Sequence, residues 1–260
     1  MTKSQLEGEH TQASIDTRVH GFDVLRGFSV ISMVLFHFCY DLRYIAGLPL
    51  GFFQPPLQDI WRCSISWAFV FIAGCMFAWS RNNLKRAGRY LAVAFLVWLV
   101  TTLVAVDTPI NFGIIYCMGS CTLICWLLDR IHFRPEGGIA ALIFFLVFLF
   151  LRDLPQGFVG IGPISFELPY SLYSTPYFAC LGFPGPGFAS GDYYPTLPYL
   201  LLYLSGSAMG RYWKRTSCPS FLITLQCAPL EWVGQHALPI YVLHQPVLLA
   251  LTMLVQALCQ

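Results

Sequence analysis

Charged residues are scarce in this sequence. Only 11% of its 260 residues are Asp, Glu, Lys or Arg, whereas charged residues make up about 25% of a soluble domain. Apolar residues reach 57%, and the mean hydropathy is +0.63. This composition excludes a cytosolic globular protein. The net charge of +2 comes from basic residues scattered along the chain, and without a basic patch we expect no nucleic-acid partner.

Several chemical signatures are also missing. The ten cysteines contain no C-x-x-C pair, so the sequence indicates neither a disulfide framework nor a zinc site, and we expect no metal. The motifs G-x-x-x-x-G-K-S/T, H-E-x-x-H and G-x-S-x-G are absent, which leaves an ATP-driven pump, a zinc protease and a serine hydrolase without support. Residues 1–20 lack the apolar core of a cleaved signal peptide, so we expect a polar cytoplasmic tail there.

Long uncharged stretches are the main positive feature. Five of them, each 17 to 29 residues long, cover residues 63–80, 90–106, 108–128, 193–210 and 232–260. A helix needs roughly 20 apolar residues to cross a bilayer core of about 30 Å. We therefore predict a single all-α polytopic membrane domain over residues 21–260. Its spans, about seven in number, are expected at residues 24–42, 64–80, 90–106, 112–128, 138–151, 195–211 and 238–258.

Residues 152–194 are apolar but rich in helix-breaking residues. They contain six prolines and seven glycines, and lipid cannot satisfy the backbone groups that such breaks set free. The segment is therefore predicted to be a folded cap or re-entrant loop packed on the bundle. Residues 216–230 are bounded by Pro219 and Pro229 and are too short for a span, so we expect an interfacial segment there rather than an eighth span.

The basic residues are distributed unevenly over this layout. Twelve of the 15 Lys and Arg residues lie in the tail and in alternate loops, and only Arg43, Arg62 and Arg152 lie in the other loops. Cytoplasmic loops carry the excess of basic residues in membrane proteins. We therefore expect a cytoplasmic N-terminus, an external C-terminus and an external cap.

The first predicted span carries ionisable residues that are costly in lipid. Arg26 and His37 are eleven residues apart, which places them on one face of a helix about 16 Å apart along its axis. Asp23 lies one turn before Arg26, and Asp41 and Tyr44 continue the same face. This stripe should face the bundle interior. It fits a histidine base held by a carboxylate, with a cation at the cytoplasmic mouth, and it also fits buried pairs that only hold helices together.

The last predicted span carries a second polar group. Tyr241, His244 and Gln245 adjoin Pro246, which removes a backbone hydrogen bond and kinks the helix. These side chains either support the histidine of the first span or contact the substrate that its base would deprotonate. The alternative is that His244 only makes a hydrogen bond between helices.

The loop between the second and third spans is basic. Arg81, Lys85, Arg86 and Arg89 lie close together in it. They either only determine topology or form a landing site for a phosphate-rich ligand.

Small residues recur at helical spacing in two spans. Gly206 and Gly210 form a G-x-x-x-G pattern, which predicts a close-packing face. Cys117, Cys121 and Cys125 are four residues apart. This cysteine stripe is more typical of packing than of a soft-metal site.

Several segments together resemble a known family. FDVLRG (22–27), continuing to FHFCYDL (36–42), looks like the first helix of the transmembrane acyltransferases. More narrowly, it resembles the heparan-alpha-glucosaminide N-acetyltransferase catalytic domain family in its short bacterial form. Further similar segments are ISWAFVFIAG (65–74), NFGIIYCMGS (111–120), GDYYPTLPYLLLYLSGSAMGR (191–211) and LPIYVLHQPVLL (238–249).

The resemblance implies transfer of an acyl group, typically acetyl, from cytoplasmic acyl-CoA to a sugar or lipid-linked acceptor on the far side of a bacterial plasma membrane. By this resemblance His37 is the catalytic histidine and Arg26 the basic partner on the donor's path. The other candidates come from the reading of the residues: Asp41 as the partner of His37; Arg81, Lys85, Arg86 and Arg89 for the donor; Asp23, Tyr44, Arg62, Tyr241, His244 and Gln245 as acceptor-binding or supporting residues.

Two further points stay open at this stage. The chain could assemble as a homo-oligomer. The competing hypothesis for its function is a non-catalytic membrane carrier or sensor that uses the same polar stripe as a ligand or proton path.

Overall fold

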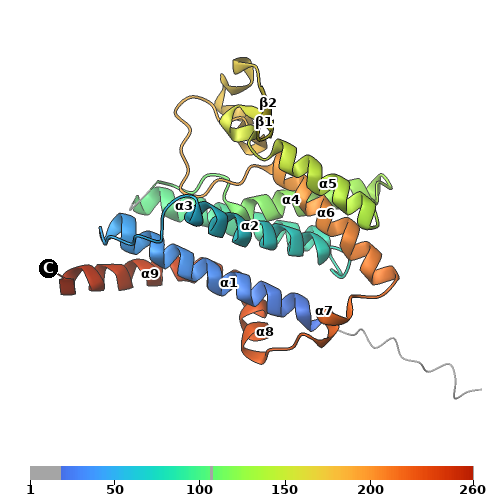
Figure 1. The fold of residues 1–260 in the computed structure, drawn as a ribbon, viewed down its shortest axis with the longest axis horizontal. Helices are drawn as coiled ribbons and strands as arrows, with labels where there is room; N and C mark the ends of the chain where they lie inside the picture. Colours follow the sequence, from blue (N-terminus) through green and yellow to red (C-terminus); the bar gives the residue numbers. More distant parts are fainter. Residues whose placement is uncertain (1–18, 106–107, 260) are drawn as a thin grey trace, which may run out of the picture.

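The computed structural model describes residues 19–105 and 108–259. Within them, seven long α-helices run back and forth beside one another (Figure 1). Each overlaps one of the seven predicted spans, and the predicted tail over residues 1–20 lies almost entirely outside the described residues. The helices are α1 (His20–Tyr40), α2 (Leu57–Cys75), α3 (Asn83–Val104), α4 (Ile114–Arg130), α5 (Gly138–Leu151), α6 (Thr196–Arg215) and α9 (Ala237–Cys259).

Four helical segments are long and apolar enough to cross a membrane. They are His20–Ile45, Asn83–Val104, Gly138–Gln156 and Ala237–Leu258. The chain is a membrane protein on this ground. Membrane crossing by α2, α4 and α6 stays a prediction, because α4 has only 17 residues and because α2 and α6 carry charged side chains near one end.

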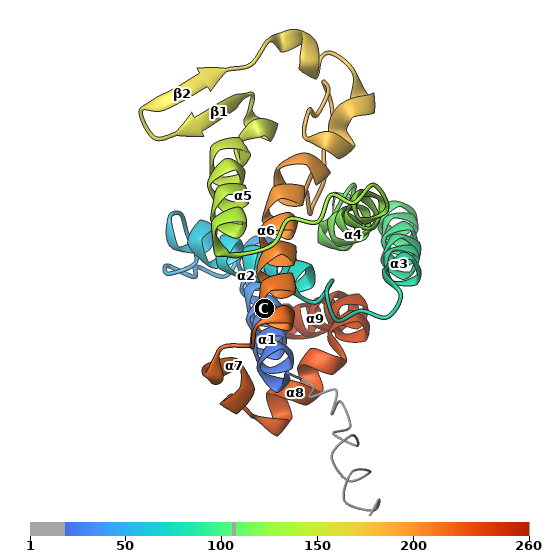
Figure 2. The same ribbon diagram turned by 90° about the vertical axis from the view of Figure 1, so that its right-hand side faces the viewer.

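The main core lies among α2, α4 and α6. Tyr203 of α6 is fully buried, and its hydroxyl lies 2.9 Å from that of Thr122 on α4. Val70 of α2 belongs to the same cluster. Figure 2 shows α6 between α5 and α4, with α3 outside α4. Few residues of α3 and α5 are buried, so these apolar helices are the surfaces that meet lipid.

The helices α2 and α6 pack unusually closely. A Cβ atom on Gly206 would clash with the carbonyl oxygen of Phe71, and one on Gly210 would clash with that of Cys75. The two backbones therefore touch, as small residues at a membrane helix interface permit. The close-packing face predicted from the G-x-x-x-G pattern is confirmed.

The segment before α9 folds into two short helices against α1. α7 (Ser220–Thr224) has five residues and α8 (Ala228–Gln235) has eight, about 12 Å for the longer one. The prediction that residues 216–230 are too short for an eighth span is confirmed. Gly27 of α1 and Gly234 of α8 each leave no room for a Cβ atom against the other helix, so α8 is held tightly beside the first turns of α1.

Three helices begin at least four residues earlier than predicted. α1 starts at His20 rather than residue 24, α2 at Leu57 rather than residue 64, and α3 at Asn83 rather than residue 90. The expected bounds were wrong because uncharged stretches define the lipid-compatible part of a helix and not its first turns. Asn82 sets the start of α3, because its side chain accepts a hydrogen bond from the backbone N–H of Lys85 at 2.8 Å.

Residues 152–194 form a folded cap, as predicted. A two-stranded antiparallel hairpin, β1 (Phe158–Ile161) and β2 (Ile164–Glu167), projects beyond the end of α5 (Figure 1). Three short 3-10 helices complete it: η2 (Leu154–Gln156), η3 (Tyr170–Tyr173) and η4 (Pro176–Leu181).

The cap is bonded to itself and to the bundle. The Tyr173 hydroxyl donates to the carbonyl of Leu154 at 2.6 Å, and the Asn111 side chain, between α3 and α4, donates to the carbonyl of Ala189 at 2.8 Å. The predicted contact of the cap with the bundle is therefore confirmed, whereas its place on the outer face stays a prediction. The Gly/Pro density produces turns whose backbone groups are satisfied by protein rather than lipid.

The glycine contact gives a stability test. We expect Gly206→Ala to lower the midpoint of thermal unfolding in detergent, equivalent to about 1–3 kcal/mol, because a methyl group must push α2 and α6 apart. The matched control is Gly88→Ala on α3, where nothing lies within 4 Å of an added Cβ atom. Because alanine has the higher helix propensity, the control should be neutral or stabilising. Equal effects of the two variants would show that the contact does not limit stability.

Candidate active site

Two histidines from neighbouring helices meet near the C-terminal end of α1. His37 lies 17 residues after the start of α1 at His20, about 26 Å along the helix. His244 of α9 places its Nε2 atom 3.3 Å from His37 Nδ1, and the ring centroids are 4.9 Å apart. Both side chains are half-buried. The structure therefore brings together the two histidines that the sequence singled out separately.

Backbone carbonyls determine which ring nitrogens carry hydrogen. His37 Nδ1 lies 3.0 Å from the carbonyl oxygen of Met33, and His244 Nδ1 lies 2.6 Å from that of Tyr241. A carbonyl only accepts, so each neutral ring is protonated at Nδ1. His244 Nε2 can then accept from His37 Nδ1. The remaining nitrogen, His37 Nε2, keeps its lone pair and forms no hydrogen bond with a described residue.

A buried carboxylate lies beside this pair. Asp41 is 0% exposed and begins a short π-helical turn, η1 (Asp41–Ile45). Gln245 Nε2 donates to both of its carboxylate oxygens, at 3.1 and 3.2 Å. Because a carboxylate only accepts, the amide of Gln245 is held with Nε2 toward Asp41. Its Oε1 atom is buried and, within the described part of the chain, has no hydrogen-bond partner.

A second carboxylate reaches the site from the loop that follows the cap. Asp192 is half-buried, and its Oδ2 atom lies 3.0 Å from the backbone nitrogen of Ile114 and 3.4 Å from the Tyr241 hydroxyl, both of which donate to it. Burial raises the pKa of this carboxyl above its usual range, and the two donors partly offset that effect. Asp192 thus joins the cap, the start of α4 and the helix that carries His244.

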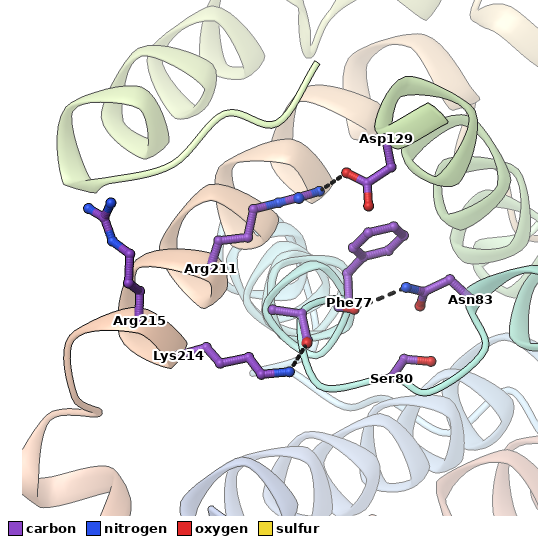
Figure 3. A pocket seen from close by; sticks show the side chains of 8 residues that line it. Phe77, Ser80, Asn83, Asp129, Arg211, Lys214 and Arg215 are labelled. Atoms are coloured by element: carbon purple, nitrogen blue, oxygen red, sulfur yellow. Dashed lines mark hydrogen bonds and ion pairs between the residues drawn. The ribbon is translucent and has the colours of Figure 1, made fainter. Parts of the chain in front are cut away.

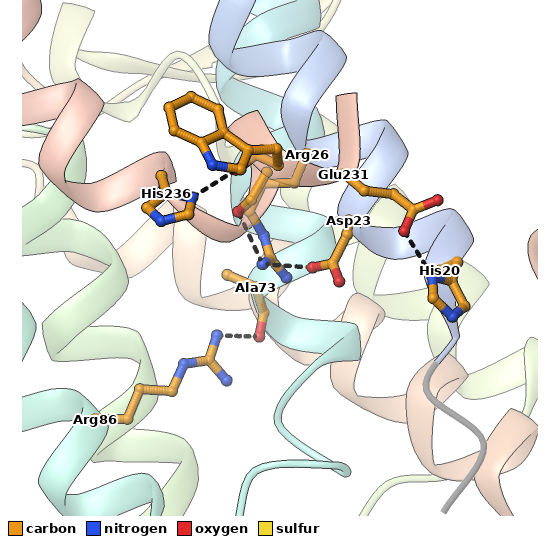
Figure 4. Close-up of polar contacts among 9 residues, drawn as sticks. His20, Asp23, Arg26, Ala73, Arg86, Glu231 and His236 are labelled. Atoms are coloured by element: carbon orange, nitrogen blue, oxygen red, sulfur yellow. Dashed lines mark hydrogen bonds and ion pairs between the residues drawn. The ribbon is translucent and has the colours of Figure 1, made fainter. Parts of the chain in front are cut away.

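The predicted donor-binding cations divide into two groups. Arg26 Nη1 lies 3.2 Å from Asp23 Oδ1 and 3.3 Å from the carbonyl oxygen of Gly234. Arg86 Nη2 donates to the carbonyl of Ala73 at 2.9 Å, and Figure 4 shows the guanidinium groups of Arg26 and Arg86 on either side of Ala73. These two side chains point into the bundle. The other three, Arg81, Lys85 and Arg89, are exposed.

The polar stripe of α1 does not continue inward to its last predicted member. Tyr44 is 51% exposed, and its hydroxyl donates to half-buried Gln58 at 3.1 Å. The expectation of an inward-facing Tyr44 was wrong because the wider turn η1 takes it out of α-helical register. Arg62 is likewise exposed and pairs with Asp59 at 3.3 Å. An acceptor-binding role for either residue stays a prediction.

The hydrogen bonds of Asp41 and His37 do not test the expected direct contact between these two residues. The hydrogen bonds described above connect Asp41 to Gln245, whereas His37 is connected to Met33 and His244. The geometry therefore gives Asp41 a route to the histidine pair through α9. Its role as the direct orienting partner of His37 stays a prediction.

A comparison with known families decides the relationship. The family described as heparan-alpha-glucosaminide N-acetyltransferase, catalytic, matches residues 18–246. The chain belongs to this family. No curated protein and no solved structure matches the chain. The resemblance seen in the sequence is confirmed, and membership implies membrane acetyltransferase activity in general.

The match to this N-acetyltransferase family includes every residue of the histidine cluster. His37 and Asp41 lie near its start, and His244 and Gln245 lie just before its end at residue 246. The matched region therefore contains all of α1 and the first part of α9, which together build the pair. The remainder of α9, from Val247 onward, follows the matched region.

Sequence reasoning missed Asp192 as a member of the site. Its position was visible as the last charged residue before the uncharged run 193–210, within the family-like segment 191–211. Nothing in the sequence alone joined it to Tyr241, 49 residues further along. That link depends on how the cap returns across the N-terminus of α4.

A cavity of about 360 Å³ lies at the carboxyl ends of α2, α4 and α6 (Figure 3). Arg211 Nη2 there lies 2.8 Å from Asp129 Oδ1, and Lys214 Nζ donates to the carbonyl of Ala78 at 2.7 Å. Helix carboxyl ends are partly negative, so cations are stabilising at this position. These protein contacts account for the cations in the cavity without a ligand.

The cysteine stripe of α4 is packed inside the bundle. Cys117, Cys121 and Cys125 are buried, and Cys125 Sγ lies 3.6 Å from Ser207 Oγ of α6. Among the described residues, no group of three or more His, Cys, Asp or Glu side chains is arranged to hold a metal ion. The stripe therefore contributes to the α4–α6 contact.

The Asp41–Gln245 contact can be tested by a double-mutant cycle. We expect Gln245→Leu to destabilise the protein by about 1–3 kcal/mol, because it removes a donor from a buried carboxylate. In the Asp41→Leu background the same change should cost much less. The measurement is the midpoint of thermal unfolding in detergent.

The control cycle uses the exposed Tyr44–Gln58 hydrogen bond. Tyr44→Phe and Gln58→Leu should show almost no coupling, because both side chains remain hydrated. Simple additivity of the two changes at Asp41 and Gln245 would contradict the assigned contact.

Proposed function

We propose that this protein transfers an acyl group, in the first instance acetyl, from acyl-CoA at the cytoplasmic face to a hydroxyl or amino group of a sugar or lipid-linked acceptor at the outer face. The observation that carries the proposal is the His37–His244 pair, in which His37 Nε2 is left with a free lone pair. A neutral imidazole of this kind is a general base for a hydroxyl or amine nucleophile.

The proposed step uses both histidines. His37 Nε2 takes the proton from the acceptor's oxygen or nitrogen as that atom attacks the thioester carbonyl carbon. The carbon–sulfur bond breaks, and His37 returns the proton to the CoA thiolate. While His37 is positively charged, its Nδ1–H donates to the Met33 carbonyl and to His244 Nε2, which stabilises the imidazolium as the third member of a triad does.

Gln245 supplies a fitting contact for the acceptor. Its buried Oε1 atom, held outward from Asp41, is an unused hydrogen-bond acceptor adjacent to His244. An incoming hydroxyl or amine that donates to Oε1 gains a hydrogen bond that the protein alone does not make. In this proposal Asp41 positions Gln245, and Gln245 orients the nucleophile.

The proposed donor path starts at the opposite end of α1. Arg26 precedes His37 by eleven residues of one continuous helix, about 16 Å, and acyl-CoA carries phosphates that a guanidinium group binds well. Arg81, Lys85 and Arg89 are exposed and lie within five residues of Arg86 in the sequence. They would meet the same phosphate charges. This path requires a cytoplasmic N-terminus and seven helices that cross the plasma membrane. Both requirements are part of the proposal.

The decisive experiment concerns the two histidines. We expect His37→Ala to lower the rate of acyl transfer by about 100- to 10,000-fold, because it removes the general base. His244→Gln keeps an acceptor for His37 Nδ1 and should lose less. The control is His236→Gln. His236 is exposed and stacks on Trp232, with the two ring centroids 4.5 Å apart, and it is not part of the histidine pair.

Initial rates with acetyl-CoA in purified, monodisperse protein give the measurement. Retention of more than about a tenth of the rate in His37→Ala would contradict the base assignment. Absence of any thioester cleavage by the unmodified protein, with and without acceptors, would instead favour a carrier or sensor. Isolation of an acyl-histidine on His37 would replace direct transfer by a two-step route.

A separate prediction concerns the donor. We expect Arg26→Gln to raise the KM for acyl-CoA by roughly 10- to 100-fold, the cost of one lost hydrogen bond to a charged group. Arg26→Lys should restore it only in part, because an ammonium group lacks the planar fork. Asp23→Asn is the matched control, since it breaks the same ion pair but keeps the guanidinium. An equal rise in KM for both variants would make Arg26 a purely structural residue.

A further inference from the structure

The cap combines a nearly uncharged sequence with a large exposed apolar surface. Residues 154–191 contain one charged residue, Glu167, although charged residues make up about a quarter of ordinary soluble sequences. Tyr177 is 82% exposed and Tyr170 75%. Contiguous exposed apolar surface of this kind marks an interaction site with a membrane or a protein.

The hairpin has one wholly apolar face and one more polar face, which carries Ser165 and Glu167 together with Phe158 and Gly160. Val159 pairs with Phe166, and Ile161 pairs with Ile164, so these four side chains share a face, because side chains alternate along a strand. Phe166 is 59% exposed and Ile164 65%. A two-stranded hairpin with an uncovered apolar face is marginal in water. Glu167, the one charge of the segment, lies on the other face.

The position of the hairpin identifies what covers this face. The candidate span Gly138–Gln156 ends two residues before β1 begins at Phe158. Its regular part, α5, has 14 residues, about 21 Å, which is shorter than a bilayer core of about 30 Å. The hairpin therefore follows directly on the end of an apolar segment that has little length to spare beyond the bilayer core. Figure 2 shows the hairpin beyond the end of α5, far from α1 and α9.

We propose that the apolar face of the β1–β2 hairpin and the exposed tyrosines Tyr170 of η3 and Tyr177 of η4 rest in the bilayer interface at the end of α5. Tyrosine is enriched at this depth because its ring is apolar and its hydroxyl is hydrated. Arg152, 49% exposed on its side chain at the end of α5, lies where a basic group meets lipid phosphates. Glu167 then faces water from the opposite side of the hairpin. The cap is thus a lateral anchor in the membrane surface.

The test is photo-crosslinking from the two faces of one strand. The protein carries the photoreactive residue p-benzoylphenylalanine in place of Phe166 in one variant and of neighbouring Ser165 in another. Both are reconstituted in phosphatidylcholine–phosphatidylglycerol nanodiscs, illuminated and analysed by mass spectrometry. Position 166 should form phospholipid adducts and position 165, on the polar face, should form several-fold fewer. A third variant at Leu142 of α5, 56% exposed, is the positive control for lipid contact.

Two outcomes would overturn the proposal. One is the absence of lipid adducts at position 166 while position 142 is labelled. The other is crosslinking of position 166 to a second copy of the chain, which would make the hairpin a protein interface. A further variant at Tyr177 provides the same reading should the change at Phe166 disturb the hairpin. The readout involves no acyl transfer, so its result is independent of the proposed function.

Discussion

Lipid cannot hydrogen-bond, and this constraint shapes the whole arrangement around α1. The helix carries Asp23, Arg26, His37 and Asp41 along a candidate membrane span, and each such group must find its partners inside the protein. α8 meets this need near the start of α1, where the Gly234 carbonyl lies beside Arg26. α9 meets it near the end, through His244 and Gln245.

The glycine contacts follow from the same constraint. A carbonyl of α8 can reach Arg26 only because Gly27 and Gly234 let the two backbones touch. In the core, the α2–α6 contact at Gly206 and Gly210 is equally close. These interfaces hold the polar helices together in the middle, while apolar α3 and α5 surround them.

The positions of the helices could be predicted from the sequence, because uncharged stretches and the lipid requirement act locally. The bounds of α5 were predicted to the residue, whereas the first turns of α2 and α3 were missed, because charged residues such as Arg62 and Arg86 sit within them. Contacts between segments that are distant in the sequence could not be predicted. Periodicity placed His37 and Asp41 on one helix face, but only the packing of α9 showed that His244 and Gln245 are their partners.

The cluster around His37 and Gln245 leaves part of its hydrogen-bonding capacity unused. Elsewhere in the bundle, the guanidinium group of half-buried Arg86 and the ammonium group of exposed Lys214 donate to backbone carbonyls. At the histidine cluster, two atoms form no hydrogen bond with a described residue: Oε1 of Gln245 and Nε2 of His37. Both accept hydrogen, and both are fixed by neighbours that can only accept. A bound molecule with a donor group, such as a hydroxyl or an amine, supplies what this pair of atoms lacks. The carbonyl of Met33 and the carboxylate of Asp41 therefore do more than satisfy their partners, because they determine that the site receives a proton donor.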